Sequence, residues 1–98
     1  MLYIINKNHA DNQALHHCLQ RVSAGDSVLL IEHAVYAALD VESTPLQTLP
    51  ENVGVFVLKD DMQARGVPQA ACLDFIQLVD YQGFVELVTT HTVHRSYF

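Results

Sequence analysis

The 98-residue sequence has no tryptophan, two cysteines, four glycines and three prolines. Two cysteines are too few for a disulfide framework, and the separation between Cys18 and Cys72 does not match metal-ligand spacing. No run of about 18 apolar residues occurs, which argues against a membrane-spanning helix. The first residues, Met1–Lys7, lack the basic and long apolar segments of a signal peptide. We therefore expect a reduced, cytoplasmic setting and no membrane contact.

Basic charge is also scarce, with 5 Lys and Arg residues against 11 Asp and Glu, for a formal net charge of −6. Direct, tight binding to nucleic acid needs a basic surface, so this class of function is not expected. Half of the residues are hydrophobic and 16% are charged, which excludes disorder. The length allows one domain, residues 1–98. So small a domain with so much apolar surface indicates that part of it is shared with a partner.

Four apolar runs predict buried strands, because each lacks the alternation of a half-exposed strand. They are Leu2–Ile5, Val28–Ile31, Val53–Leu58 and Phe75–Val79. Between and after them the spacing predicts four helices. The first carries Leu15, Cys18, Leu19 and Val22 on one face, and the last begins at Asp80 and carries Phe84, Leu87 and Val88 on one face. Two short helices are predicted between these, at Ala34–Leu39 and Asp61–Arg65. The alternation predicts a small, doubly wound, parallel α/β sheet with helices on both faces, layered as in flavodoxin.

Other segments receive weaker assignments. Glu42–Pro50 is predicted to be a loop with room for one helical turn, and the polar segment Thr92–Phe98 is assigned to no strand or helix. Asp11 or Asn12, Asp60 or Asp61, and Asp80 are expected to cap helices at their N-termini. Gly25 is expected to end the first helix.

The polar residues do not assemble into a recognisable catalytic, cofactor or metal site. Asn6–His9, after the first predicted strand, contains no glycine, so a phosphate-binding loop is not expected there. The six histidines include the adjacent His16 and His17, and also His91 and His94, which would share a helix face if the last helix extended that far. Neither pair has an obvious third ligand, so solvated or packed histidines are the simpler interpretation.

The two cysteines leave alternatives open. Cys18 lies on the apolar stripe of the first predicted helix, where a thiol packs as a small hydrophobe, although a role as a sulfur carrier or redox thiol stays possible. Cys72 lies in a predicted loop before the fourth strand, where its thiol could be exposed.

Longer strings of residues resemble the TusB/DsrH family of sulfur-relay proteins, within the DsrE/DsrF-like superfamily. The matching blocks occur in the family's order and span nearly the whole chain: Met1–Asn8, Gly25–Leu39, Val57–Gly66 and Val79–His91. The chain departs from the family at His33–Ala34, where an acidic residue and a glycine are usual, and at Tyr97–Phe98, where the family usually has a terminal tryptophan.

The resemblance implies a function as one subunit of a complex. TusB-like, TusC-like and TusD-like subunits form a heterohexamer with two copies of each, which takes sulfur from TusA and passes it to TusE for 2-thiolation of the wobble uridine of tRNA. In this superfamily the sulfur-carrying cysteine follows the third strand, before a helix that ends in Arg-Gly. The matching segment here, Leu58–Asp61, has no cysteine. The resemblance therefore implies a structural subunit without its own catalytic residue or cofactor.

Two other interpretations remain. The chain could be the DsrH subunit of a DsrE–DsrF–DsrH complex of sulfur oxidation, with Cys18 carrying sulfur, or an independent α/β module that binds a small ligand. For a subunit, Tyr36, Tyr81 and Phe84 are the aromatic residues expected nearest a contact, because aromatic residues are enriched in interface cores. The helical spacing could also place Phe84 wholly inside the chain's own core.

Overall fold

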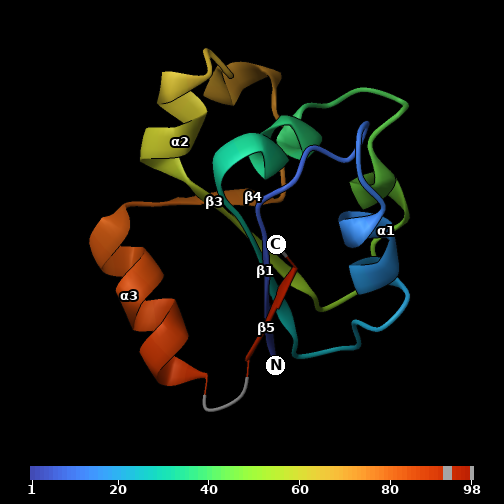
Figure 1. Cartoon of the computed structure of the whole chain (residues 1–98), viewed down its shortest axis with the longest axis vertical. Helices are drawn as coiled ribbons and strands as arrows, with labels where there is room; N and C mark the ends of the chain where they lie inside the picture. Colours follow the sequence, from blue (N-terminus) through green and yellow to red (C-terminus); the bar gives the residue numbers. More distant parts are fainter. Residues whose placement is uncertain (92–93, 98) are drawn as a thin grey trace.

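The computed structural model describes residues 1–91 and 94–97, and within them strands and helices alternate along the chain (Figure 1). The strands are β1 (Leu2–Ile5), β2 (Ser27–Leu30), β3 (Gly54–Leu58), β4 (Ile76–Val79) and β5 (His94–Tyr97). The α-helices are α1 (Ala14–Leu19), α2 (Lys59–Ala64) and α3 (Tyr81–Thr90). Short 3₁₀ helices are η1 (Glu32–Ala38), η2 (Pro45–Thr48) and η3 (Gln69–Ala71). Over this part of the chain, no helix has the length and apolarity needed to cross a membrane.

All neighbouring strands pair in parallel, in the order β4-β3-β2-β1-β5. The first three connections each move the chain by one strand in the same direction, whereas the connection from β4 returns to the far side of β1. Because such crossovers are right-handed, the two directions place their helices on opposite faces. Figure 1 shows α3 alone on one side of the sheet and α1 on the other. The predicted doubly wound parallel sheet with helices on both faces is confirmed.

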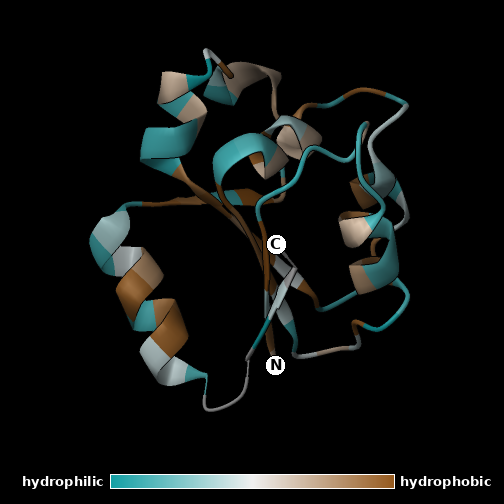
Figure 2. Cartoon of the chain, in the orientation of Figure 1, coloured by the Kyte–Doolittle hydropathy of each residue, from teal (hydrophilic) through white to brown (hydrophobic). Residues whose placement is uncertain are grey.

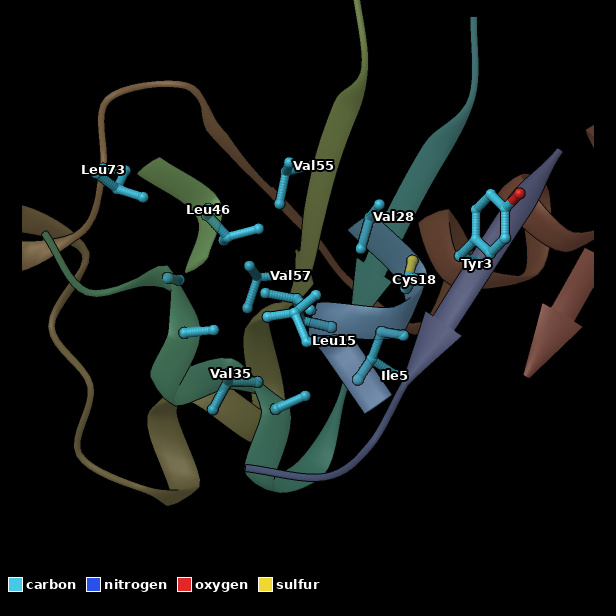
Figure 3. Close-up of a cluster of buried hydrophobic side chains, with 14 of the residues drawn as sticks. Tyr3, Ile5, Leu15, Cys18, Val28, Val35, Leu46, Val55, Val57 and Leu73 are labelled. Carbon is cyan, nitrogen blue, oxygen red and sulfur yellow. The ribbon is translucent and has the colours of Figure 1, made fainter. Parts of the chain in front are cut away.

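Two hydrophobic cores lie on the two faces of the sheet. In β1, Tyr3 and Ile5 point into the larger core, whereas Leu2 and Ile4 point into the smaller one. This explains why β1, β2 and β3 are apolar runs. The prediction that the fourth strand is buried is wrong: β4 lies at the edge of the sheet, Gln77 is exposed, and its other three residues are half-buried. The larger core, part of which is drawn in Figure 3, is closed by residues of α1, η1, η2 and α2. The smaller core is closed by α3, through Phe84, Leu87 and Val88.

The fifth strand was not predicted from the sequence. β5 pairs with β1 in a register that runs from Leu2 with His94 to Ile5 with Tyr97. Its sequence, His-Arg-Ser-Tyr, has no apolar run, and Figure 2 shows it paler than the brown central strands. Parallel pairing uses backbone N–H and C=O groups, so an edge strand can form with polar side chains. Of the segment Thr92–Phe98, residues Thr92, Val93 and Phe98 lie outside the described residues.

The short helix predicted at Ala34–Leu39 is present in a tighter form, as the 3₁₀ helix η1. Ala34, Val35, Ala37 and Ala38 are all buried. At three residues per turn, residue 34 stacks over residue 37 and residue 35 over residue 38, so two adjacent rows face the core. The predicted loop at Glu42–Pro50 contains η2, which adds the buried Leu46 to the same core.

The capping predictions have mixed outcomes. Asp80 caps α3, and its Oδ1 accepts the N–H of Gly83 at 2.7 Å. The N-cap of α1 is Gln13, although Asn12 Oδ1 accepts the N–H of Ala14 at 2.7 Å. Gly25 does not end α1, which stops at Leu19. It forms the turn before β2 instead, with a φ of +93° that favours glycine.

Candidate functional site

The thiol of Cys18 lies inside the larger core. Cys18 lies on α1 and is 0% exposed, and Figure 3 shows its side chain among those of Leu15, Ile5 and Val28. Burial raises the pKa of the Cys18 thiol to about 12, and the negative charge of Asp26 adds to the increase. The nucleophilic form of cysteine is the thiolate, so a buried thiol with this pKa is almost entirely protonated and unreactive at neutral pH.

Cys72 is half-buried, at the end of η3, and is not a disulfide partner of Cys18, since both cysteines are free. Its Sγ lies 3.5 Å from the carbonyl oxygen of Pro68, to which it donates, and 3.9 Å from Sδ of Met62. Burial raises the pKa of this thiol too. Neither cysteine therefore has the electropositive, accessible surroundings that activate a sulfur nucleophile.

The carboxyl end of β3 carries Lys59, Asp60 and Asp61, and no thiol. The N-cap of α2 is Leu58 and its side chain makes no capping hydrogen bond, so the prediction that Asp60 or Asp61 caps this helix is wrong. Asp61 Oδ2 instead accepts the N–H of Glu32 at 2.7 Å, and Asp61 also pairs with Arg65 at 3.8 Å.

That hydrogen bond ties α2 to the start of η1. Glu32 has a φ of +50°, which is uncommon for a residue with a side chain. Its N–H is directed at the Asp61 carboxylate, which offers a charge-assisted hydrogen bond as compensation. The neighbouring carboxylates of Asp60 and Asp61 therefore differ: Asp60 is exposed, whereas Asp61 stabilises the turn after β2 through its hydrogen bond with Glu32.

A cleft of about 450 Å³ lies where β3 and β4 end. Its lining residues come from α2, η3, β4 and the first turn of α3: Lys59, Gln69, Leu78, Val79, Asp80 and Gly83. The chain leaves β3 towards α2, on the larger core, but leaves β4 towards α3, on the smaller core. Adjacent strands whose connections diverge in this way form the crevice in which open α/β sheets bind ligands.

A second hollow, of about 350 Å³, lies at the carboxyl ends of β1 and β2. Lys7, Asn8, Asp11, Asn12 and His33 line it. These are polar side chains from the segments that directly follow β1 and β2, and neither segment contains a glycine, so the hollow lacks the backbone approach that a phosphate-binding loop provides.

The histidines do not form a metal site in the described residues, where no group of three metal-ligating side chains occurs. His91 is the C-cap of α3 and His94 begins β5, so the predicted pair does not share a helix face. The Nδ1 atoms of His9 and His16 are buried and accept or donate no hydrogen bond. Burial lowers the pKa of His9, the charge of His16 lowers it further, and Asp11 partly opposes both.

The three predicted interface aromatics lie on two faces of the molecule. Tyr36 is half-buried on η1 and packs against the larger core. Tyr81 and Phe84 lie on α3, on the opposite face of the sheet, with ring centroids 6.0 Å apart. Tyr81 is 68% exposed, whereas Phe84 is half-buried in the smaller core. Sequence reasoning missed Val85, 45% exposed, four residues after Tyr81 and hence on the same helix face.

Comparison with known proteins identifies relatives that match most of the chain. A protein family described as "DsrH like protein" matches residues 7–94. A protein TusB of Yersinia pestis is 34% identical over 93 residues, which are 93% of this chain and 94% of the relative. A protein TusB of Erwinia tasmaniensis is 44% identical over 69 residues, which are 61% of this chain and 72% of the relative.

Solved structures show the same fold. The ychN protein of E. coli superimposes with a TM-score of 0.77 over 98% of this chain and 97% of its own, at 18% identity. Protein Tm0979 of Thermotoga maritima has a TM-score of 0.67 at 24% identity and covers 93% of this chain and 94% of its own. At such identities the likeness concerns the fold alone.

Proposed function

Because the chain belongs to the family of DsrH-like proteins, which includes the TusB proteins similar to it, we propose that it is a structural subunit of a TusBCD-type sulfur-transfer complex. Its partners are TusC-like and TusD-like subunits, in a heterohexamer with two copies of each, located in the cytoplasm. The complex relays sulfur from TusA to TusE for 2-thiolation of the tRNA wobble uridine. The chain itself supplies no catalytic residue, cofactor or metal.

One observation carries the structural role. The carboxyl end of β3 presents Lys59 and Asp60 in place of a thiol, and Cys18 is buried with a pKa raised to about 12. Sulfur passes between proteins by attack of a thiolate on a persulfide or disulfide, which neither arrangement allows. A subunit of this kind contributes surface and shape, while a homologous subunit carries the sulfur.

Contact with tRNA is indirect in this proposal. The formal net charge of −6 repels a phosphate backbone, and only 5 Lys and Arg residues are available to neutralise phosphates. The proposal predicts no tight tRNA binding by the isolated chain at physiological salt. Tight binding under those conditions would contradict it.

The DsrH description of the matching family supports a second candidate, a DsrH subunit of a DsrE–DsrF–DsrH complex in sulfur oxidation. If Cys18 carried sulfur there, its thiol would have to leave the core in which it is 0% exposed. Sulfite-reductase genes beside the gene for this chain would favour this candidate.

Co-expression with the neighbouring homologous chains tests the proposal. We expect the three chains to co-purify with the mass of a complex that contains two copies of each, and the Cys18→Ser variant to support sulfur transfer as the unmodified chain does. The structural role would be overturned if the chain purified alone as a monomer. It would also be overturned if the Cys18→Ser variant folded and assembled normally but no longer supported sulfur transfer.

A further inference from the structure

The turn after β2 contains a strained residue between two anchored segments. Before it, the N–H of Ile31 donates to the carbonyl of Ile5 at 3.0 Å, and the Ile31 side chain lies in the smaller core. After it, Ala34 and Val35 are fully buried in the larger core. The chain therefore crosses from one face of the sheet to the other at Glu32, which has a φ of +50°. A residue with a side chain adopts this left-handed conformation only when its surroundings enforce it.

A side chain from a distant segment holds this turn. Asp61 lies on α2, and its Oδ2 accepts the Glu32 N–H at 2.7 Å; in the part of the chain that the structure describes, this N–H has no other acceptor. Arg65 holds Asp61 in turn, because its Nη1 lies 3.8 Å from Asp61 Oδ1 and donates to the Asp61 carbonyl at 3.3 Å. Between them, Met62 anchors α2 in the larger core. The left-handed turn after β2 thus depends on the position of α2.

The same turn sets the position of one wall of the hollow at the carboxyl ends of β1 and β2. His33 directly follows Glu32 and lines this hollow together with residues of the connection from β1 to α1, among them Lys7. The helix on the other side of the hydrogen bond, α2, begins at Lys59, which lines the cleft at the ends of β3 and β4. The hydrogen bond between Glu32 and Asp61 therefore joins a wall of one hollow to the helix that lines the other.

We propose that this hydrogen bond is a conformational latch that couples the two hollows. While Asp61 holds the N–H, Glu32 stays left-handed and His33 stays at the first hollow. When α2 shifts and the bond breaks, Glu32 returns to the backbone conformations that residues with a side chain prefer, and His33 leaves the hollow with it. By linkage, a ligand that fixes His33 also fixes α2, and a contact that displaces α2 opens the first hollow. The latch operates within one chain, so it does not depend on the proposed function.

Asp61→Ala tests the latch by NMR of the whole, isotope-labelled chain. A positive φ brings the amide and Hα protons of one residue together, so the parent chain should show a strong NOE between them at Glu32. We expect the variant to lose this NOE, to exchange the Glu32 N–H at least about tenfold faster, and to shift the amide signals of His33 and Lys7. Asp60→Ala is the matched control, because Asp60 is exposed and makes no hydrogen bond or ion pair within the described residues.

Glu32→Gly separates the release of a strained turn from a general loosening of α2. Glycine adopts a positive φ without steric cost, so Glu32→Gly in the Asp61→Ala background is expected to return the His33 and Lys7 signals to their parent positions. In the parent background the same change should raise the urea midpoint, because it removes the strain.

Two NMR results would overturn the latch: an Asp61→Ala chain that keeps the Glu32 NOE and its slow exchange, or shifts that Glu32→Gly does not reverse. If Asp61→Ala does not fold, the urea midpoint of Glu32→Gly decides. A midpoint below that of the parent would show that Glu32 is not strained and that the turn needs no latch.

Discussion

At the scale of single residues, the buried thiol of Cys18 makes a clear prediction. Cys18→Ser places a hydroxyl in an apolar site, and we expect the free energy of unfolding to fall by about 1–3 kcal/mol, with sulfur transfer by the assembled complex retained. Urea denaturation and a transfer assay measure the two effects. Cys72→Ser, at a half-buried position, is the matched control and should cost less. Rapid alkylation of Cys18 at neutral pH in the folded chain would contradict the burial argument.

His9 predicts a dependence of stability on pH. Its pKa in the folded chain is lowered, first by burial and then by His16. The unfolded chain therefore binds more protons below the ordinary histidine pKa of 6.5, and stability must fall as the pH decreases through and below that value. We expect the urea midpoint to drop between pH 7 and pH 5.5, and the drop to be smaller in His9→Gln. The exposed His17, changed to Gln, serves as the control, and equal pH slopes in all three proteins would refute the role of His9.

At the scale of elements, α3 is the one helix that closes the smaller core within the described chain, so the stability of this layer depends on how the helix begins. Asp80→Ala removes the acceptor for the Gly83 N–H, and we expect a loss of about 1 kcal/mol, with a range of about 0.5–2. Asp80→Asn keeps an acceptor oxygen and should lose less. Thermal unfolding followed by circular dichroism measures both, and an alanine variant as stable as the parent would show that the cap contributes nothing.

At the scale of the whole molecule, assembly should depend on residues that the isolated chain does not need. Tyr81→Ala is expected to change the free energy of unfolding by less than about 0.5 kcal/mol, because the side chain is 68% exposed, while weakening co-purification with the homologous subunits. Tyr36→Ala should weaken assembly as well, but with a loss of stability, since Tyr36 also packs against the larger core. The matched exposed control is Val41→Ala, on the face opposite α3. Undiminished complex formation by both tyrosine variants would count against these contacts.

The sequence by itself determined the layers of the fold. Its four apolar runs became β1 to β4. In β1, β2 and β3 the side chains on both faces are largely buried and must be apolar, and that requirement can be read without coordinates. The burial of Cys18 also followed from local spacing, since helical periodicity places it with Leu15 on one face. The Asp80 cap depended only on residues three apart in sequence. The absence of a thiol at Leu58–Asp61 needed no structure at all.

Only the tertiary structure decided the features that join distant segments. β5 forms because β1 offers unpaired backbone groups to a polar segment about 90 residues away, and such pairing leaves no hydrophobic pattern in the sequence. Asp61 holds the N–H of Glu32, 29 residues earlier, instead of capping its own helix. The cleft around Lys59 exists because the connections from β3 and β4 leave the sheet on opposite sides, which the strand order sets. Local propensities act within a few residues, whereas these contacts depend on which strands become neighbours, and that is settled by the packing of the whole chain.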